Sequence, residues 1–258
     1  MIKKGLTLVL CSFFALFAAV PAAIAQEKTP ELAEVWNIEP AAGHSKDFYA
    51  GVKAHMAFRL EQGDPRRWQA YTPLLGDEIS GVAVRYCCVS WADVDAYRAW
   101  DDAHPQVGQH FQEHVGPHIG SVSHYFQSVD WSNSHWSDAK GPWRLFAVTE
   151  YQVEPEDAAD FDQAKEKMSQ IALEQGWASD DNLWLWMSTI GGSPLQAIVL
   201  PYRDFAGMER GDDTFMSFLV DKLGSAEAAG ELVQDFLGAT EGSTFQIWEH
   251  QPELSMPE

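Results

Sequence analysis

The chain has 258 residues, of which 46% are hydrophobic and 21% are charged. It is therefore long and apolar enough to bury a core, which excludes a disordered polymer. Asp and Glu number 38 against 17 Lys and Arg, a formal net charge of −21. An acidic protein of this kind repels nucleic acids and anionic lipid surfaces, so we expect neither as a partner.

Residues 1–25 have the pattern of a secretory signal peptide. Two lysines near the start precede an apolar stretch over 6–20, and a small-residue cleavage site ends at Ala25. The apolar stretch is shorter than a membrane span, and no later segment approaches that length. We therefore expect a secreted or periplasmic protein that has no membrane contact after the signal peptide is removed.

The hydrophobic pattern of residues 31–130 predicts the element order βαββαβ. The expected elements are a strand over 32–38, a helix from Ser45, strands over 67–72 and 81–89, helical pieces after Ser90 and from Pro105, and a strand over 121–129. Ser90 is expected to cap its helix together with Asp93, three residues later. The element order is that of a ferredoxin-like unit.

Cys87 and Cys88 are adjacent within the expected strand over 81–89. A bond between them would close almost no chain, so they cannot act as the long-loop staple of a disulfide-rich scaffold. We interpret them as two small buried residues of a strand. A vicinal disulfide is the alternative in an oxidising compartment.

Short matches recur along the chain, shifted by 113 to 115 positions, which indicates an internal duplication. The matching segments are 36–40 with 151–155, 47–48 with 160–161, and 90–95 with 204–209. A polar linker over 131–142 leads into a second βαββαβ unit over 143–250, and residues 251–258 form a tail. We expect an α+β fold of two tandem ferredoxin-like units, packed sheet to sheet as a pseudo-dimeric barrel.

In this order of elements the sequence resembles the dimeric α+β barrel group. Its members include antibiotic biosynthesis monooxygenase-like, NIPSNAP-like and haem-handling proteins. The most characteristic residues are the strand–helix junctions at 89–93 and 203–207, and the resemblance covers nearly all of the chain after residue 25. It includes no catalytic signature, and one fold supports several unrelated activities.

Strand alternation predicts which side chains point into the barrel. Arg85 lies opposite the apolar face of Val82, Val84 and Tyr86, so we expect it inside, and Gln69 is expected on the same side. The predicted ligand-binding residues are Asn37, Tyr71, Arg85, Glu150, Gln152, Trp184 and Trp186. Aromatic walls with a few polar groups suit a small organic ligand. The alternative is a filled barrel in which Arg85 pairs with Glu150 or reaches solvent at a rim.

Five of the nine histidines lie between Asp102 and His124. His110 and His114 are four residues apart, so on a helix they share a face and are candidate metal ligands. The resemblance to haem-handling proteins, which use a helix histidine as the iron ligand, makes either a candidate haem ligand. The alternative is a solvated helix face.

Three functions remain open at this stage. The first is an exported barrel protein that binds a small organic ligand without catalysis. The second is a cofactor-independent monooxygenase-like oxidoreductase, in which Asn37, Tyr71 and Arg85 hold a carbanion or phenolate. The third is a haem-binding oxidoreductase that uses a histidine of the first unit. The sequence is compatible with a monomer or a homodimer.

Overall fold

The computed structural model describes residues 31–77, 79–209 and 211–257. The predicted signal peptide lies outside the described residues, and export stays a prediction. Within the described ranges, none of the helices combines the length and apolar character that a membrane crossing needs.

The described chain follows the predicted element order twice. The first half contains β1 (Leu32–Pro40), α1 (Ser45–Glu61), β2 (Gln69–Leu75), β3 (Val82–Val89), α2 (Trp91–Ala103), α3 (Pro105–His114), η1 (Gly116–His118) and β4 (Ile119–Val129). After η2 (Trp131–Asn133), the second half contains β5 (Leu145–Gln152), α4 (Ala158–Glu174), β6 (Leu185–Ile190), β7 (Leu195–Tyr202), η3 (Ala206–Met208), α5 (Phe215–Leu223), α6 (Ala226–Gly238) and β8 (Gly242–His250).

The helix starts follow local sequence signals. Asp93 donates its backbone N–H to Ser90 Oγ at 3.2 Å, and Ser90 donates its own to Asp93 Oδ2 at 2.8 Å, so the predicted cap of α2 is confirmed. The strand predicted over 67–72 is shifted toward the C-terminus, because β2 runs over Gln69–Leu75 and Pro73 pairs with Trp248 of β8. The contact with the other half thus extends this strand.

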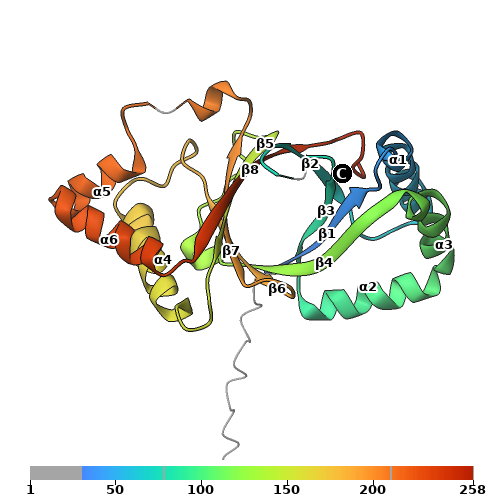
Figure 1. Cartoon of the computed structure of the whole chain (residues 1–258), viewed down its shortest axis with the longest axis horizontal. Coiled ribbons are helices and arrows are strands. Elements are labelled where there is room, and N and C mark those ends of the chain that lie inside the picture. The colour runs from blue at the N-terminus through green and yellow to red at the C-terminus, as the bar shows by residue number, and fades with distance from the viewer. Residues whose placement is uncertain (1–30, 78, 210, 258) are drawn as a thin grey trace, which may run out of the picture.

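The strands form one closed barrel in the order β1-β3-β2-β8-β5-β7-β6-β4. The halves contribute the runs β4-β1-β3-β2 and β8-β5-β7-β6, which have the same relative order. The two sheets therefore join at their edges, through β2–β8 and β4–β6. In Figure 1, α1, α2 and α3 lie on one side of the barrel and α4, α5 and α6 on the other.

Each half has its own core between the outer face of its strands and its helices. In the first half, Phe48 of α1 packs with a cluster that includes Ile38 and Val84, and in the second half Phe161 of α4 packs with Trp186 and Phe236. A third cluster, which includes Val129, Met187 and Val199, fills part of the barrel interior. Every strand residue therefore faces either helices or the barrel interior.

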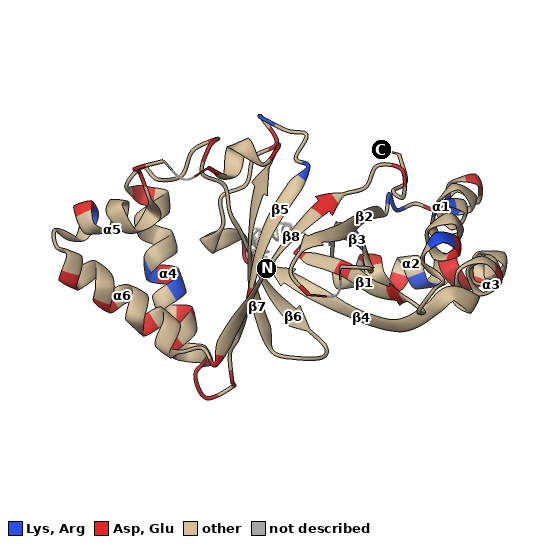
Figure 2. Cartoon of the chain, turned by 45° about the horizontal axis from the view of Figure 1, so that its top comes forward, with Lys and Arg blue, Asp and Glu red and all other residues tan. Residues whose placement is uncertain are grey.

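Asp and Glu positions are spread over the helices and loops of both halves, as Figure 2 shows, whereas Lys and Arg positions are fewer. The segment after β8 returns to the first half. Gln251 donates its backbone N–H to the Ala70 carbonyl oxygen and Met256 donates to that of Trp68, each at 2.8 Å. The buried Met256 side chain joins the core of the first half, so the end of the chain links the two halves.

We expect Phe48→Ala and Phe161→Ala each to lower the free energy of unfolding by about 3–5 kcal/mol, because each removes a fully buried ring from one helix–sheet core. Both side chains are 0% exposed, whereas Phe205, the control for an exposed ring, is 52% exposed. Phe205→Ala should change stability by less than about 0.5 kcal/mol. Urea unfolding checks all three, and a loss in either core no larger than in the control would contradict this assignment of the cores.

Candidate functional site

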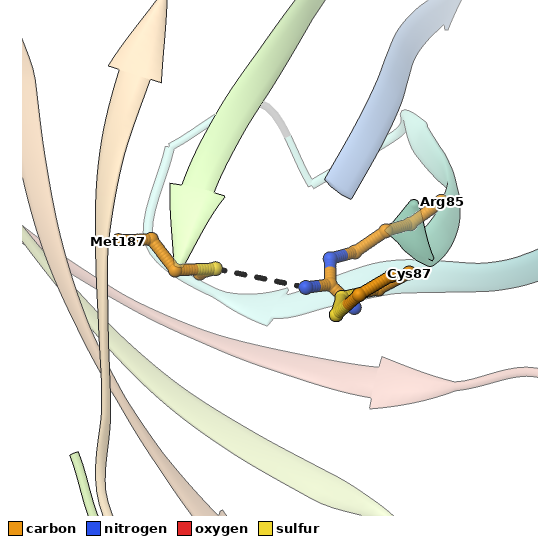
Figure 3. The surroundings of a disulfide bond; sticks show 4 residues. Arg85, Cys87 and Met187 are labelled. Carbon is orange, nitrogen blue, oxygen red and sulfur yellow. Dashed lines mark hydrogen bonds between the residues drawn. A yellow bond between two sulfur atoms is a disulfide. The ribbon is translucent and has the colours of Figure 1, made fainter. Parts of the chain in front are cut away.

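The barrel interior gathers several of the predicted ligand-binding residues. Asn37 of β1 donates its side-chain N–H to Tyr125 Oη at 2.9 Å. The ring of Tyr71 on β2 lies edge-on to Phe146 of β5, with centroids 5.3 Å apart. Arg85 of β3 reaches across the interior and donates from Nη2 to Met187 Sδ of β6 at 3.6 Å (Figure 3). The inward position predicted for Arg85 is confirmed.

The ion pair between Arg85 and Glu150, which the sequence left open as an alternative, is not formed. Within the part of the chain that the structure describes, no carboxylate lies within 4.0 Å of the Arg85 guanidinium. Burial lowers the pKa of Arg85, while Tyr71 and Tyr125 oppose that shift. Burial raises the pKa of Glu150, which favours its neutral form. The two groups therefore share the barrel without neutralising each other.

Several inward-facing side chains remain partly accessible. Arg85, Tyr125, Phe146 and Glu150 all point inward from enclosing strands, yet each is only half-buried. Gln69 also lies inside, where its Oε1 is 2.9 Å from His250 Nε2. Gln152 lies at the end of β5, is exposed and donates to Glu154, so it belongs to the rim rather than the wall.

The inward positions predicted for Trp184 and Trp186 are wrong. Both rings face the helices of the second half, and Trp186 packs against Phe161. They line a cavity of about 590 Å³ between the sheet and α4 and α5, on the opposite face of the sheet from Arg85. Leu185 and Met187 take the interior positions. The run over 183–187 is apolar on both faces, so alternation of polarity could not indicate which residues point inward.

Cys87 and Cys88 form a vicinal disulfide, so their interpretation as two free buried residues is wrong. Both pack against the interior cluster that contains Met187. Figure 3 shows the Cys87 sulfur beside the Arg85 guanidinium, with Met187 facing both from the opposite side. The disulfide is therefore part of the wall around Arg85.

His110 does not fit the role of a metal or haem ligand. Arg59 Nη1 lies 3.3 Å from His55 Nε2, and because a guanidinium only donates, His55 accepts there and carries its proton on Nδ1. His55 Nδ1 lies 3.3 Å from His110 Nδ1, which must then accept and leave its own proton on Nε2. In this arrangement neither ring nitrogen of His110 presents a free lone pair to a metal ion.

His114 is exposed, and its ring lies 4.2 Å from that of His110. No group of three or more His, Cys, Asp or Glu that could hold a metal ion occurs within the described ranges. The aromatic cavity of about 590 Å³ has no histidine in its lining. The residues present therefore do not fit an axially ligated haem in that cavity or at His110.

A buried polar network in the first half was not predicted. Glu34 lies on the helix-facing side of β1, where it accepts from His124 Nε2 at 2.9 Å and from Arg66 Nη1. Burial raises the pKa of Glu34, but these hydrogen bonds and charges outweigh it and leave the pKa below its usual range. The Arg66 guanidinium also stacks over the Tyr97 ring, 3.7 Å from its centroid. The sequence feature that could have indicated this network is Glu34 itself, a charged residue on the same strand face as the apolar Leu32.

No family model matches the sequence, and no curated protein matches it. Among solved structures, a candidate monooxygenase from Fusobacterium nucleatum is similar, with a TM-score of 0.53 and 10% identity over 89% of this chain and 95% of that one. A candidate monooxygenase from Lactobacillus acidophilus has a TM-score of 0.51 and 8% identity over 86% of this chain and 94% of that one. A chlorite dismutase variant from Candidatus Nitrospira defluvii has a TM-score of 0.50 and 10% identity over 88% and 94%. At these identities the similarity establishes the ferredoxin-like α+β barrel fold and no activity.

We expect His55 to make the protein less stable in acid. Burial, helped by the charges of Arg59, His110 and His114, lowers the pKa of His55 to about 3. Between about pH 6.5 and pH 3 the unfolded chain binds a proton that the native ring does not, so stability falls as the pH falls, by about 1.4 kcal/mol per unit.

His55→Gln should flatten this pH dependence by about that slope, whatever its effect on stability at neutral pH. His44→Gln is the matched control, because His44 is exposed and should leave the slope unchanged. Urea unfolding between pH 4 and pH 7 measures both, and an equal slope in wild type and His55→Gln would refute the assignment.

Proposed function

We propose that the barrel binds a small organic anion, a carboxylate or phenolate carried on an aromatic ring, with Arg85 as its anchor. The observation that carries this proposal is the Arg85 guanidinium inside the barrel, which has a thioether acceptor and no carboxylate within salt-bridge distance among the described residues. Burying a charge without a counter-charge costs several kcal/mol. A ligand that supplies the counter-charge recovers that cost.

The groups around Arg85 suit the same ligand. Burial raises the pKa of Tyr125 to about 12, so its hydroxyl keeps its proton at neutral pH. Because Asn37 already donates to the Tyr125 oxygen, the Tyr125 O–H is left to donate to a ligand oxygen. The rings of Tyr71 and Phe146 offer apolar contact for an aromatic group. Burial raises the pKa of Glu150, and no salt bridge joins it to Arg85, so the guanidinium stays available to a ligand.

Further features belong to the same proposal. The identical strand order of the two halves supports an origin by duplication. A place in the antibiotic biosynthesis monooxygenase-like or NIPSNAP-like part of the fold group is part of this proposal and rests on the order of elements alone. The pattern of residues 1–25 supports export to the periplasm or the medium, where the ligand would be met. Because both sheets of the barrel come from one chain, a monomer suffices to build the site.

Benzoate and its neutral analogue benzamide test the anchor, with binding measured by calorimetry. We expect wild type to bind benzoate, and Arg85→Met to weaken that binding at least about tenfold, or about 1.4 kcal/mol. Benzamide carries no charge, so its affinity should be the same for wild type and Arg85→Met. Arg98→Met, which removes an exposed arginine of α2, should bind benzoate as wild type does.

Arg85→Met should also keep or raise the free energy of unfolding, because it removes a buried charge that has no ionic partner. This measurement separates loss of binding from loss of fold. Equal benzoate affinity in wild type and in folded Arg85→Met would refute the proposed anchor.

A cofactor-independent oxygenase is the second candidate. Arg85 and Tyr125 lie close enough to influence each other's pKa, so both could donate to one phenolate oxygen and hold the electron-rich form that reacts with O₂. We expect such an enzyme to consume O₂ with a hydroquinone faster than autoxidation, measured with an oxygen electrode. Arg85→Met should remove the excess rate. A wild-type rate equal to autoxidation would refute the oxygenase function and leave ligand binding as the proposed function.

A further inference from the structure

We propose that the Cys87–Cys88 disulfide is a redox switch on the anion site: reduction places a Cys87 thiolate against Arg85, where it displaces the anionic ligand. The effect on the ligand rests on the proposed function of Arg85, whereas the formation of the thiolate does not. The switch would make binding depend on the thiol–disulfide state of the surroundings.

The register of β3 places the disulfide at the anion site. Cys87 lies two residues beyond Arg85 on the same inward face, and Figure 3 shows its sulfur next to the guanidinium. In the pairing of β1 with β3, Cys87 faces Ala33 and Val89 faces Leu32, so Cys88 is an extra residue in the register. Both cysteines therefore contact the interior cluster, although neighbours in a regular strand point to opposite faces.

The disulfide is open to small reductants. Both cysteines are only half-buried, as is Arg85 beside them. A low-molecular-weight thiol would attack one sulfur to give a mixed disulfide, and a second thiol would then release it. Overall, two thiols lose two electrons and become one external disulfide, while Cys87 and Cys88 gain these electrons and two protons as free thiols.

The Cys87 thiol would then lose its proton to solvent. A neighbouring cation lowers the pKa of a thiol, and Arg85 is a cation without a carboxylate partner among the described residues. Among the described residues, the side chain that accepts a hydrogen bond from Arg85 is Met187, whose neutral sulfur lies 3.6 Å away. A thiolate carries a full negative charge and is a stronger acceptor than this thioether. The reduced protein thus carries its own counter-charge at the place proposed for the ligand.

Thiolate absorbance at 240 nm tests the first step without any ligand. Cys88→Ser leaves Cys87 as the thiol beside Arg85, and Cys87→Ser leaves Cys88 as the matched control. We expect the Cys87 thiol in Cys88→Ser to ionise at least one pH unit lower than a free cysteine, and Arg85→Met to remove that shift. Arg85→Met should change the pKa of the Cys88 thiol in the control variant Cys87→Ser by a smaller amount. An Arg85-independent titration of Cys87 would overturn the proposal.

Benzoate binding before and after treatment with dithiothreitol tests the second step. The treated protein should expose two additional thiols and bind benzoate at least tenfold more weakly, while the double variant Cys87→Ser/Cys88→Ser should bind equally in both conditions. No gain of thiols, or unchanged affinity after a confirmed gain, would overturn the switch. If benzoate binds neither form, the proposed ligand site fails, and the Cys87 titration still decides whether the thiolate forms against Arg85.

Discussion

Closure of the barrel is the constraint on which the rest of the structure depends. Each half supplies four adjacent strands whose outer edges would otherwise present unpaired backbone groups. The seams β2–β8 and β4–β6 satisfy these edges, and both are short, with four residue pairs each. Closure also encloses the inner face of both sheets. A charge on that face, such as Arg85, is partly shielded from solvent, so a counter-charge supplied by the barrel or by its contents would stabilise it.

The two halves solve the same packing problem in different ways. The second half fills the space between helices and sheet with aromatic rings, including Phe161, Trp186 and Phe236. The first half places ionised groups there, with Glu34 held between His124 and Arg66. Buried ion pairs fix geometry more than they add stability. The first half is therefore the more polar and pH-sensitive of the two, although the strand order is the same.

How far the sequence predicted the structure depended on the contrast between the two faces of each strand. In β3 a single charge interrupts an apolar alternation, so the inward position of Arg85 could be derived from residues 82–86 alone. In β6 both faces are apolar, so Trp184 and Trp186 could not be distinguished from Leu185 and Met187. Element order was predictable for a related reason: helices and strands differ in period over many residues, whereas the two faces of a strand differ only by a shift of one.

Contacts that join distant segments could not be derived in this way. The partners of Glu34 lie 32 and 90 positions away along the chain, and nothing local identifies them. The acceptor that Arg85 contacts lies 102 positions away, on the far wall of the barrel. The cysteine pair was visible in the sequence, but its chemical meaning depends on Arg85 beside it. Arg85 and Cys87 come from one short strand, so a strand that is ordinary in pattern places a cation and a redox-active sulfur together. A protein selected for stability alone would have replaced the charge by an apolar side chain, and its retention inside the barrel is the physical reason to look for an anion there.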